Sequence, residues 1–114
     1  VKLEKLRKIN RYHVELFSEF VARLNSTPAG DGTLLDDTMI IYGAGMSESH
    51  SHGSRNLPIL LVGGGAGTGG SHVRYDQDTP LANLHLSLLD KMGVPIESLG
   101  DSTGRLALEP LSGV

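Results

Sequence analysis

The sequence Thr38-Met39-Ile40-Ile41-Tyr42-Gly43 decides the predicted fold class. Its apolar residues follow one another without alternation, which predicts a β-strand covered on both faces and ended by glycine. Residues 57–62 form a second such run, in which Pro58 is tolerated near the beginning of a strand. A third, short strand is predicted at residues 72–75. Because doubly covered strands are typical of parallel sheets, we predict an α/β fold with a small, mostly parallel sheet of two to three strands.

Two segments with helical periodicity flank these strands. Apolar residues recur at steps of three and four over residues 3–24, which predicts a long N-terminal helix of about 24 residues ending before Pro28. Near the C-terminus, Thr79 is expected to cap a second helix, with Pro80 at its first position and Gly93 as its stop. The stripe that this second helix is expected to bury consists of Leu81, Leu84, Leu88 and Leu89.

The composition excludes several classes of protein. Hydrophobic residues make up 39% of the chain and charged residues 20%, which fits a folded protein. The net charge of −3 gives no electrostatic reason to expect a nucleic-acid partner. The longest apolar run, residues 57–62, is far shorter than the roughly 20 residues of a membrane span, so no membrane partner is predicted. The absence of cysteine excludes disulfides, thiolate metal sites and a cysteine nucleophile.

The predicted elements do not make a complete domain. The 114 residues have room for one domain, residues 1–114, but sheets usually hold about 4–6 strands, and two or three leave open edges. The apolar stripe of the long helix also demands a partner surface. No signal peptide is predicted, because the first residues lack its apolar core. The chain begins with Val1 in place of an initiator methionine, which favours a chain that was processed or cut from a longer one. We therefore predict a C-terminal fragment of a larger domain that associates with itself as a homo-oligomer.

The segment Glu48-Ser49-His50-Ser51-His52 has the character of a metal-binding loop. Two histidines separated by one residue can direct both imidazoles at one ion, and Glu48 can add an oxygen ligand, a donor set that suits a divalent metal such as zinc. The further ligands would come from His72, Asp76 or Asp78. The alternative interpretation is a plain polar surface loop.

A glycine tract at residues 63–70 contains the spacing Gly65-x-Gly67-x-x-Gly70. A dinucleotide site would require a helix to open at the last glycine, but residues 71–75 favour extended structure. We interpret the tract as a loop that permits a positive φ or a close backbone approach.

Several longer motifs resemble a bacterial family catalogued only as domain of unknown function 1552. They read Gly-Thr-Leu-Leu-Asp-Asp-Thr-Met-Ile-Ile-Tyr-Gly-Ala-Gly-Met-Ser at residues 32–47 and Asn-Leu-Pro-Ile-Leu-Leu-Val-Gly-Gly-Gly at residues 56–65. They continue as Thr-Pro-Leu-Ala-Asn-Leu at residues 79–84, Met-Gly-Val at residues 92–94 and Gly-Asp-Ser-Thr-Gly at residues 100–104. The resemblance implies that the chain is the C-terminal third or so of a longer protein. Because family members often carry a twin-arginine signal, it also implies export of the parent protein to the periplasm.

That family in turn resembles the alkaline phosphatase and sulfatase superfamily. The superfamily carries an Asp-His metal pair after a central strand, where this chain has Gly-Ala-Gly-Met at residues 43–46. A later His-Gly before a proline-containing strand matches His52-Gly53 ahead of Pro58. The resemblance therefore implies one metal ligand, His52, and places the nucleophile outside this chain.

Two functional hypotheses follow from these patterns. The first is a non-catalytic, self-associating fragment of a hydrolase-like protein. The alternative is part of a metal-dependent phosphate- or sulfate-ester hydrolase, in which His50, His52 and Glu48 hold the ion and the ion polarises the ester or its attacking water.

Overall fold

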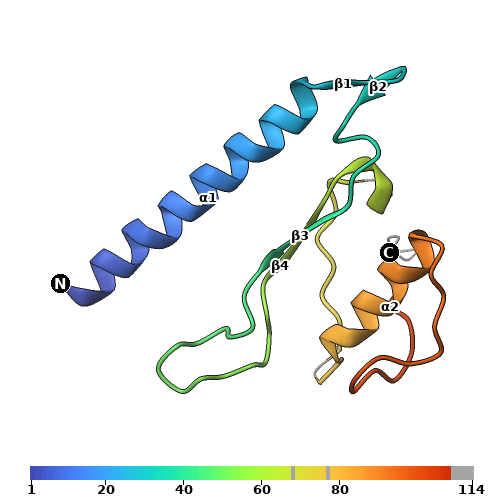
Figure 1. Cartoon of the computed structure of the whole chain (residues 1–114). Coiled ribbons are helices and arrows are strands. Elements are labelled where there is room, and N and C mark those ends of the chain that lie inside the picture. Colours follow the sequence, from blue (N-terminus) through green and yellow to red (C-terminus); the bar gives the residue numbers. More distant parts are fainter. Residues whose placement is uncertain (68, 77, 109–114) are drawn as a thin grey trace.

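The computed structural model describes residues 1–67, 69–76 and 78–108. Figure 1 shows a long helix beside a narrow hairpin, with a second, shorter helix near the C-terminus. In chain order the elements are α1 (Lys2–Ser26), β1 (Pro28–Ala29), β2 (Gly32–Thr33), β3 (Ile40–Gly43), β4 (Ile59–Val62), the 3₁₀ turn η1 (Gly64–Ala66) and α2 (Leu81–Lys91).

Helix α1 confirms the prediction of a long N-terminal helix. The helix ends at Ser26, two residues before Pro28. A residue that precedes a proline is driven out of the helical region, and Thr27 accordingly has the extended angles φ −95° and ψ 114°. The Thr27 hydroxyl donates a hydrogen bond of 2.6 Å to the carbonyl oxygen of Arg23 and so satisfies one of the free carbonyls of the last turn. Pro28 then pairs with Thr33 in the small β1–β2 hairpin.

The β3 and β4 strands pair antiparallel, so the prediction of a mostly parallel sheet is wrong. Ile40 lies opposite Val62 and Gly43 lies opposite Ile59. The physical reason is the connection: residues 44–58 form a long loop without a helix, whereas parallel strands need a crossover, usually helical. Exposure also alternates along β3, so its apolar run does not mark a strand covered on both faces.

The third predicted strand is also absent. Residues 71–76, all of which the structure describes, form neither helix nor strand. Two separate two-stranded sheets, β1–β2 and β3–β4, take the place of the single sheet that the sequence predicted.

The glycine tract makes a close backbone approach, as predicted. The amide of Gly64 donates to the carbonyl oxygen of Leu35 at 2.9 Å, which holds η1 against the segment before β3. A Cβ at Gly64 would lie 2.3 Å from the carbonyl oxygen of Asp36, and Gly63 has a φ of +109°. Only glycine fits both positions without a shift of the backbone.

Helix α2 holds the buried residues of the described part of the chain. Leu84, Leu86 and Leu88 are its buried leucines, and Leu86, which the periodicity did not single out, has no exposed surface. Leu81 and Leu89 of the predicted stripe are half-buried instead. The helix ends as predicted, because Gly93 adopts a φ of +76°.

The beginning of α2 differs by one position from the prediction. Pro80 occupies the N-cap position and Leu81 is the first helical residue. The Thr79 hydroxyl does not cap the helix, because it donates to the carbonyl oxygen of Asp76 at 2.8 Å.

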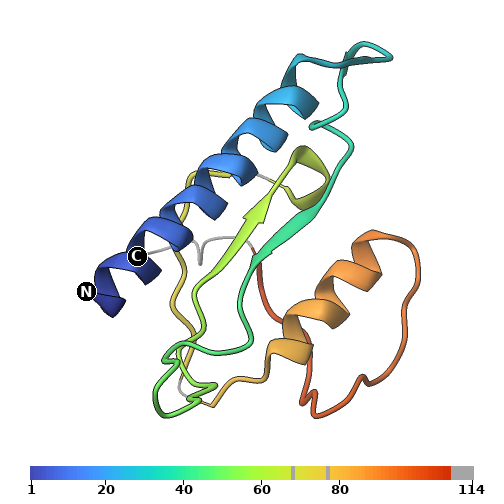
Figure 2. The ribbon, with the colours of Figure 1, turned by 60° about the vertical axis from the view of Figure 1, so that its left-hand side comes forward.

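The chain exposes far more surface than a compact protein of its mass. Its accessible area is 8933 Å², whereas a compact protein of 12.1 kDa exposes about 6,000 Å². The radius of gyration is 16.1 Å, against about 13 Å for a compact domain of this length. Figure 2 shows α1 beside the hairpin, away from α2. No helix among the described residues is both long enough and apolar enough to cross a bilayer.

Candidate functional site

Helix α1 has an inner face that its own chain partly covers. The ring of Phe17 stacks on the ring of Tyr42 in β3, with centroids 4.4 Å apart and planes 20° apart. Val21 and Leu24 lie one turn and two turns further along the same side of the helix, and both are half-buried. The stack of Phe17 on Tyr42 fixes the second half of α1 against the hairpin.

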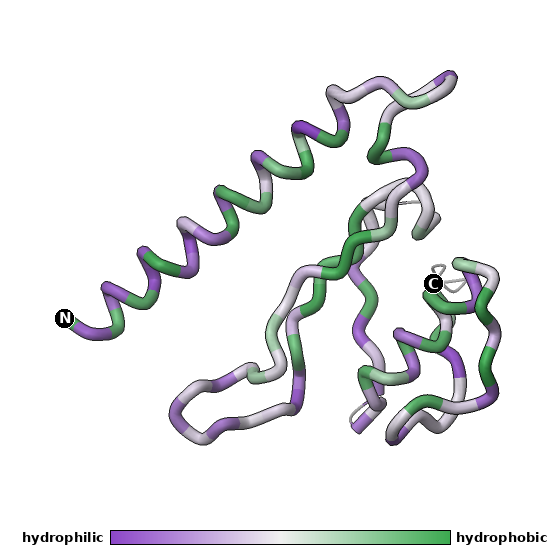
Figure 3. The backbone as a smooth tube through the Cα atoms, in the orientation of Figure 1, coloured by the Kyte–Doolittle hydropathy of each residue, from purple (hydrophilic) through white to green (hydrophobic). Residues whose placement is uncertain are grey.

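The same helix carries a second apolar stripe that its own chain leaves open. Ile9, Tyr12, Leu16 and Phe20 follow one another at steps of three and four, so they lie along one side of α1. At about 100° per residue, this outer stripe is rotated by about a quarter turn from Phe17. Its exposed fractions run from 44% for Leu16 to 58% for Tyr12. Figure 3 shows hydrophobic bands along the full length of α1.

Charged residues border the outer stripe on one flank. Lys8 and Glu19 lie on this flank, one near each end of the stripe. The ion pairs within the described residues are Arg11–Glu15, Arg55–Asp78 and Arg105–Asp90, so they engage neither Lys8 nor Glu19. The flank therefore presents one charge of each sign to an approaching surface.

A groove of about 470 Å³ separates the first half of α1 from the loop after β3. Leu6 and Met46 line it, and each is about half exposed. The other described residues that line it are Asn10, Ala44, Gly45, Ser47 and Ser49. Among the described residues, this lining is apolar or uncharged polar and includes no His, Asp, Glu, Lys or Arg.

The predicted metal-binding loop is held together by Glu48. Its carboxylate accepts hydrogen bonds from the amide of His50 at 2.8 Å, from the amide of Ser51 at 2.7 Å, and from the Ser51 hydroxyl. The Ser51 hydroxyl is the main cause that lowers the pKa of Glu48 below its ordinary value, and the two amides add to it. Glu48 therefore acts as the acceptor that orders its own turn.

The three predicted ligands share one loop without forming a ligand cluster. His50 and His52 are exposed, and His52 has a φ of +53°. Of the predicted supplementary ligands, Asp78 lies 3.3 Å from Arg55 in an ion pair, whereas His72 and Asp76 are exposed. Among the residues that the structure describes, no three His, Cys, Asp or Glu side chains come together as a metal site. Zinc binding at this loop stays a prediction.

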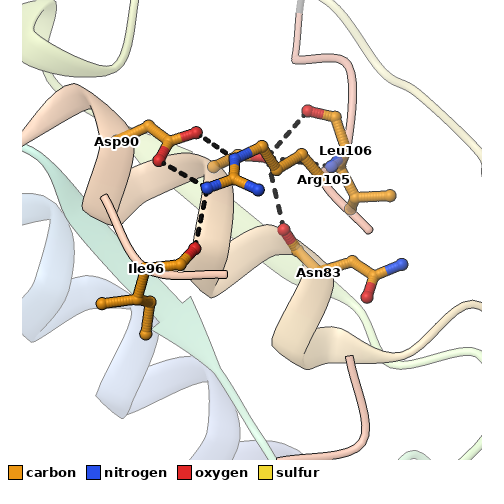
Figure 4. A network of polar contacts seen from close by, with 6 residues as sticks. Asn83, Asp90, Ile96, Arg105 and Leu106 are labelled. Carbon is orange, nitrogen blue, oxygen red and sulfur yellow. Dashed lines mark hydrogen bonds and ion pairs between the residues drawn. The ribbon is translucent and has the colours of Figure 1, made fainter. Parts of the chain in front are cut away.

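A polar network around α2 holds the C-terminal arm, residues 96–106, against that helix (Figure 4). The Asn83 side chain accepts from the amide of Thr103 at 2.8 Å and donates to its hydroxyl at 3.0 Å. Ser87 forms two hydrogen bonds of 2.8 Å with the backbone of Leu106, as donor to its carbonyl and acceptor from its amide.

An ion pair completes this network. Arg105 donates to both carboxylate oxygens of Asp90 and to the carbonyl oxygen of Ile96. The hydrogen bond from Arg105 lowers the pKa of Asp90. Sequence reasoning missed the network, although Asn83 and Ser87 are polar residues four apart on the apolar side of a helix, a pattern that requires hydrogen-bond partners.

These features define a small α/β chain with antiparallel two-stranded sheets, whose helix α1 is partly covered on one face and open on another. Comparison of the chain with protein-family models, with curated proteins and with solved structures finds no match in any of the three. The resemblance to the family of domain of unknown function 1552 stays a prediction.

Proposed function

We propose that the chain is a non-catalytic association module that works as a homo-oligomer, with the outer stripe of α1 as its contact surface. One observation carries this proposal: none of the 25 residues of α1 is buried, although the helix is amphipathic. An amphipathic helix gains most of its stability by burying its apolar face, and this chain covers only part of that face.

The magnitudes favour association. The four side chains of the outer stripe would each present about 200 Å² when fully exposed, so half-exposed they offer roughly 400 Å² per copy. At about 25 cal/mol per Å², two copies would gain about 20 kcal/mol by covering these stripes. The loss of translational and rotational freedom costs about 4–15 kcal/mol, and ordering each interface side chain costs about 0.5–1.5 kcal/mol more, so only a small surplus is expected. A small surplus fits a weak, concentration-dependent dimer.

The hydrolase alternative has less support. The carboxylate of Glu48 is engaged by its own loop, and the groove beside that loop has no charged or imidazole lining. Only the sequence resemblance suggests that the longer protein, of which this chain is predicted to be a part, is hydrolase-like. Self-association is therefore the function that the geometry supports best.

The proposal is tested by measuring molar mass against protein concentration. Multi-angle light scattering from about 1 to about 200 µM should show the mass rise toward that of a dimer, as expected for an interface of this size. Leu16→Lys, in the outer stripe, should keep the chain monomeric over the same range. Ala22→Lys is the matched control, because Ala22 is exposed and lies off both the outer stripe and the inner face of α1. A wild-type chain that stays monomeric throughout would overturn the proposal.

A further inference from the structure

We infer that two copies pair through α1 as an antiparallel, two-fold symmetric helix pair, in which Ile9 of one copy faces Phe20 of the other and Tyr12 faces Leu16. This inference rests on the proposed function, because it names the partner and the geometry of the same surface. The partner is a second copy of this chain.

The order of residues in the outer stripe makes it complementary to itself. A symmetric dimer uses the same patch on both copies, and an antiparallel pair reads that patch in opposite directions. Ile9, Tyr12, Leu16 and Phe20 read in reverse place an aromatic ring opposite an aliphatic side chain at every level. Large and small side chains then alternate across the interface, which favours close packing.

The charges on the flank fit the same arrangement. A two-fold axis perpendicular to the two helices keeps the Lys8 and Glu19 flank of both copies on one side of the pair. The register that pairs Tyr12 with Leu16 then brings Lys8 of each copy beside Glu19 of the other, which gives two intermolecular ion pairs. The same register places Lys5 of each copy opposite Arg23 of the other at the two outer ends of the stripe, where water and salt screen their like charges.

The surface is accessible for this pairing. The stack of α1 on Tyr42 uses Phe17, and the half-buried Val21 and Leu24 lie on the same inner face, away from the outer stripe. Together the two outer stripes bury about 800 Å², and the stems of flanking lysines and arginines bring the total toward about 1,000 Å², the lower limit for a specific interface. An interface of this size predicts a reversible, concentration-dependent dimer.

Crosslinking tests the orientation directly, because the chain has no cysteine and each variant carries a single thiol. Lys8→Cys and Glu19→Cys are purified separately, mixed, and treated with a short bismaleimide. The antiparallel pair predicts a crosslinked heterodimer in the mixture and almost none in either variant alone. The two copies of residue 8 would lie about 18 Å apart along the helix axis, since 12 residues at 1.5 Å separate their levels.

A charge exchange provides the second readout. At low salt, Lys8→Glu and Glu19→Lys should each weaken the dimer about 5- to 10-fold, because each turns two exposed ion pairs into two repulsive pairs. The double variant Lys8→Glu/Glu19→Lys should return to within about twofold of wild type. Circular dichroism confirms that each variant keeps its helices.

The outcomes separate the inference from the proposed function. A monomeric wild type overturns both. A dimer that is lost in Leu16→Lys but crosslinks between two copies of residue 8 keeps the proposed function and overturns the antiparallel geometry. A dimer that persists in Leu16→Lys must use another surface, such as the open edges of β3 and β4. That result overturns the role of α1 both in the proposed function and in the antiparallel pairing.

Discussion

The ring of Phe17 stacks on the ring of Tyr42 and joins α1 to β3 across 25 residues of chain, with centroids 4.4 Å apart. Three residues further along the same helix, Phe20 is half exposed on the outer stripe. Two phenylalanines of one helix therefore face two environments, one against the hairpin and one toward solvent. Phe17 therefore marks the face of α1 that holds the chain together, and Phe20 marks the face that is proposed to join two copies.

Replacing each phenylalanine with alanine should give opposite results. Phe17→Ala removes the stack and should lower the free energy of unfolding by about 1–3 kcal/mol, measured by urea denaturation of dilute protein. Phe20→Ala should change that free energy by less than about 0.5 kcal/mol, because the ring is already half in water. In concentrated protein, Phe20→Ala should weaken self-association more than Phe17→Ala. Equal effects of the two variants on both measurements would contradict the division of α1 into two faces.

The contact between Gly64 and the backbone of Asp36 predicts a strong effect of one added methyl group. Gly64→Ala should destabilise the chain by about 1–3 kcal/mol, because a Cβ would overlap a carbonyl that cannot rotate away. Thermal unfolding followed by circular dichroism measures the loss. Gly45→Ala is the matched control, since a Cβ at Gly45 meets no atom within 4 Å. A stable Gly64→Ala variant would show that η1 does not pack against this segment.

The hydrogen bonds to Glu48 predict a pH dependence of its loop. The pKa of Glu48 is lowered in the folded chain, so its stabilisation of the loop is present above the ordinary value of 4.5 and is lost as pH falls through the lowered value. Amide shifts of His50 and Ser51, followed by NMR, should therefore change together at a pH below 4.5. In Glu48→Gln this transition should vanish. A midpoint above 4.5 would contradict the hydrogen bonds that order the turn.

The buried amide of Asn83 joins the C-terminal arm to α2 through two hydrogen bonds to Thr103. Asn83→Ala removes two hydrogen bonds to Thr103 and leaves the amide of Thr103 without its acceptor, which should cost about 1–3 kcal/mol. Urea denaturation gives the magnitude, and hydrogen exchange should show faster exchange at Thr103 and Leu106. Asn10→Ala, on the exposed surface of α1, should leave both measurements nearly unchanged. If the hydrogen-exchange rate of the Thr103 amide is the same in Asn83→Ala as in the wild type, the network does not hold the C-terminal arm against α2.

Local signals predicted the helices better than the sheet. Three features of the helices depend only on a few neighbouring residues: the helical period of α1, its end before Pro28, and the stop of α2 at Gly93. The structure confirms all three. The direction of strand pairing depends on the path of residues 44–58, and the apolar runs of β3 and β4 carry no information on that path. A helix-free connection was the available signal for an antiparallel pair.

The candidate site was predictable in part. The apolar stripe of α1 was visible in the sequence, but its division into two faces depends on the stack of Phe17 on Tyr42, a contact between distant residues. Glu48 was predicted as a ligand because residue types show potential donors; only the fold shows that its oxygens already accept hydrogen bonds from His50 and Ser51. Long-range contacts of this kind cannot be read from spacing.

The confinement of the buried leucines to α2 has a consequence for the order of folding. The polar network closes the arm onto that helix over a sequence separation of only 20 residues, between Asn83 and Thr103. Short loops close at low entropic cost, and contacts of low contact order form quickly. The C-terminal part of the chain can therefore close on itself without α1, whose stack on Tyr42 forms across a comparable separation of 25 residues. Until Phe17 docks on Tyr42, both faces of α1 are open, so capture by a second copy competes with docking onto the hairpin of its own chain.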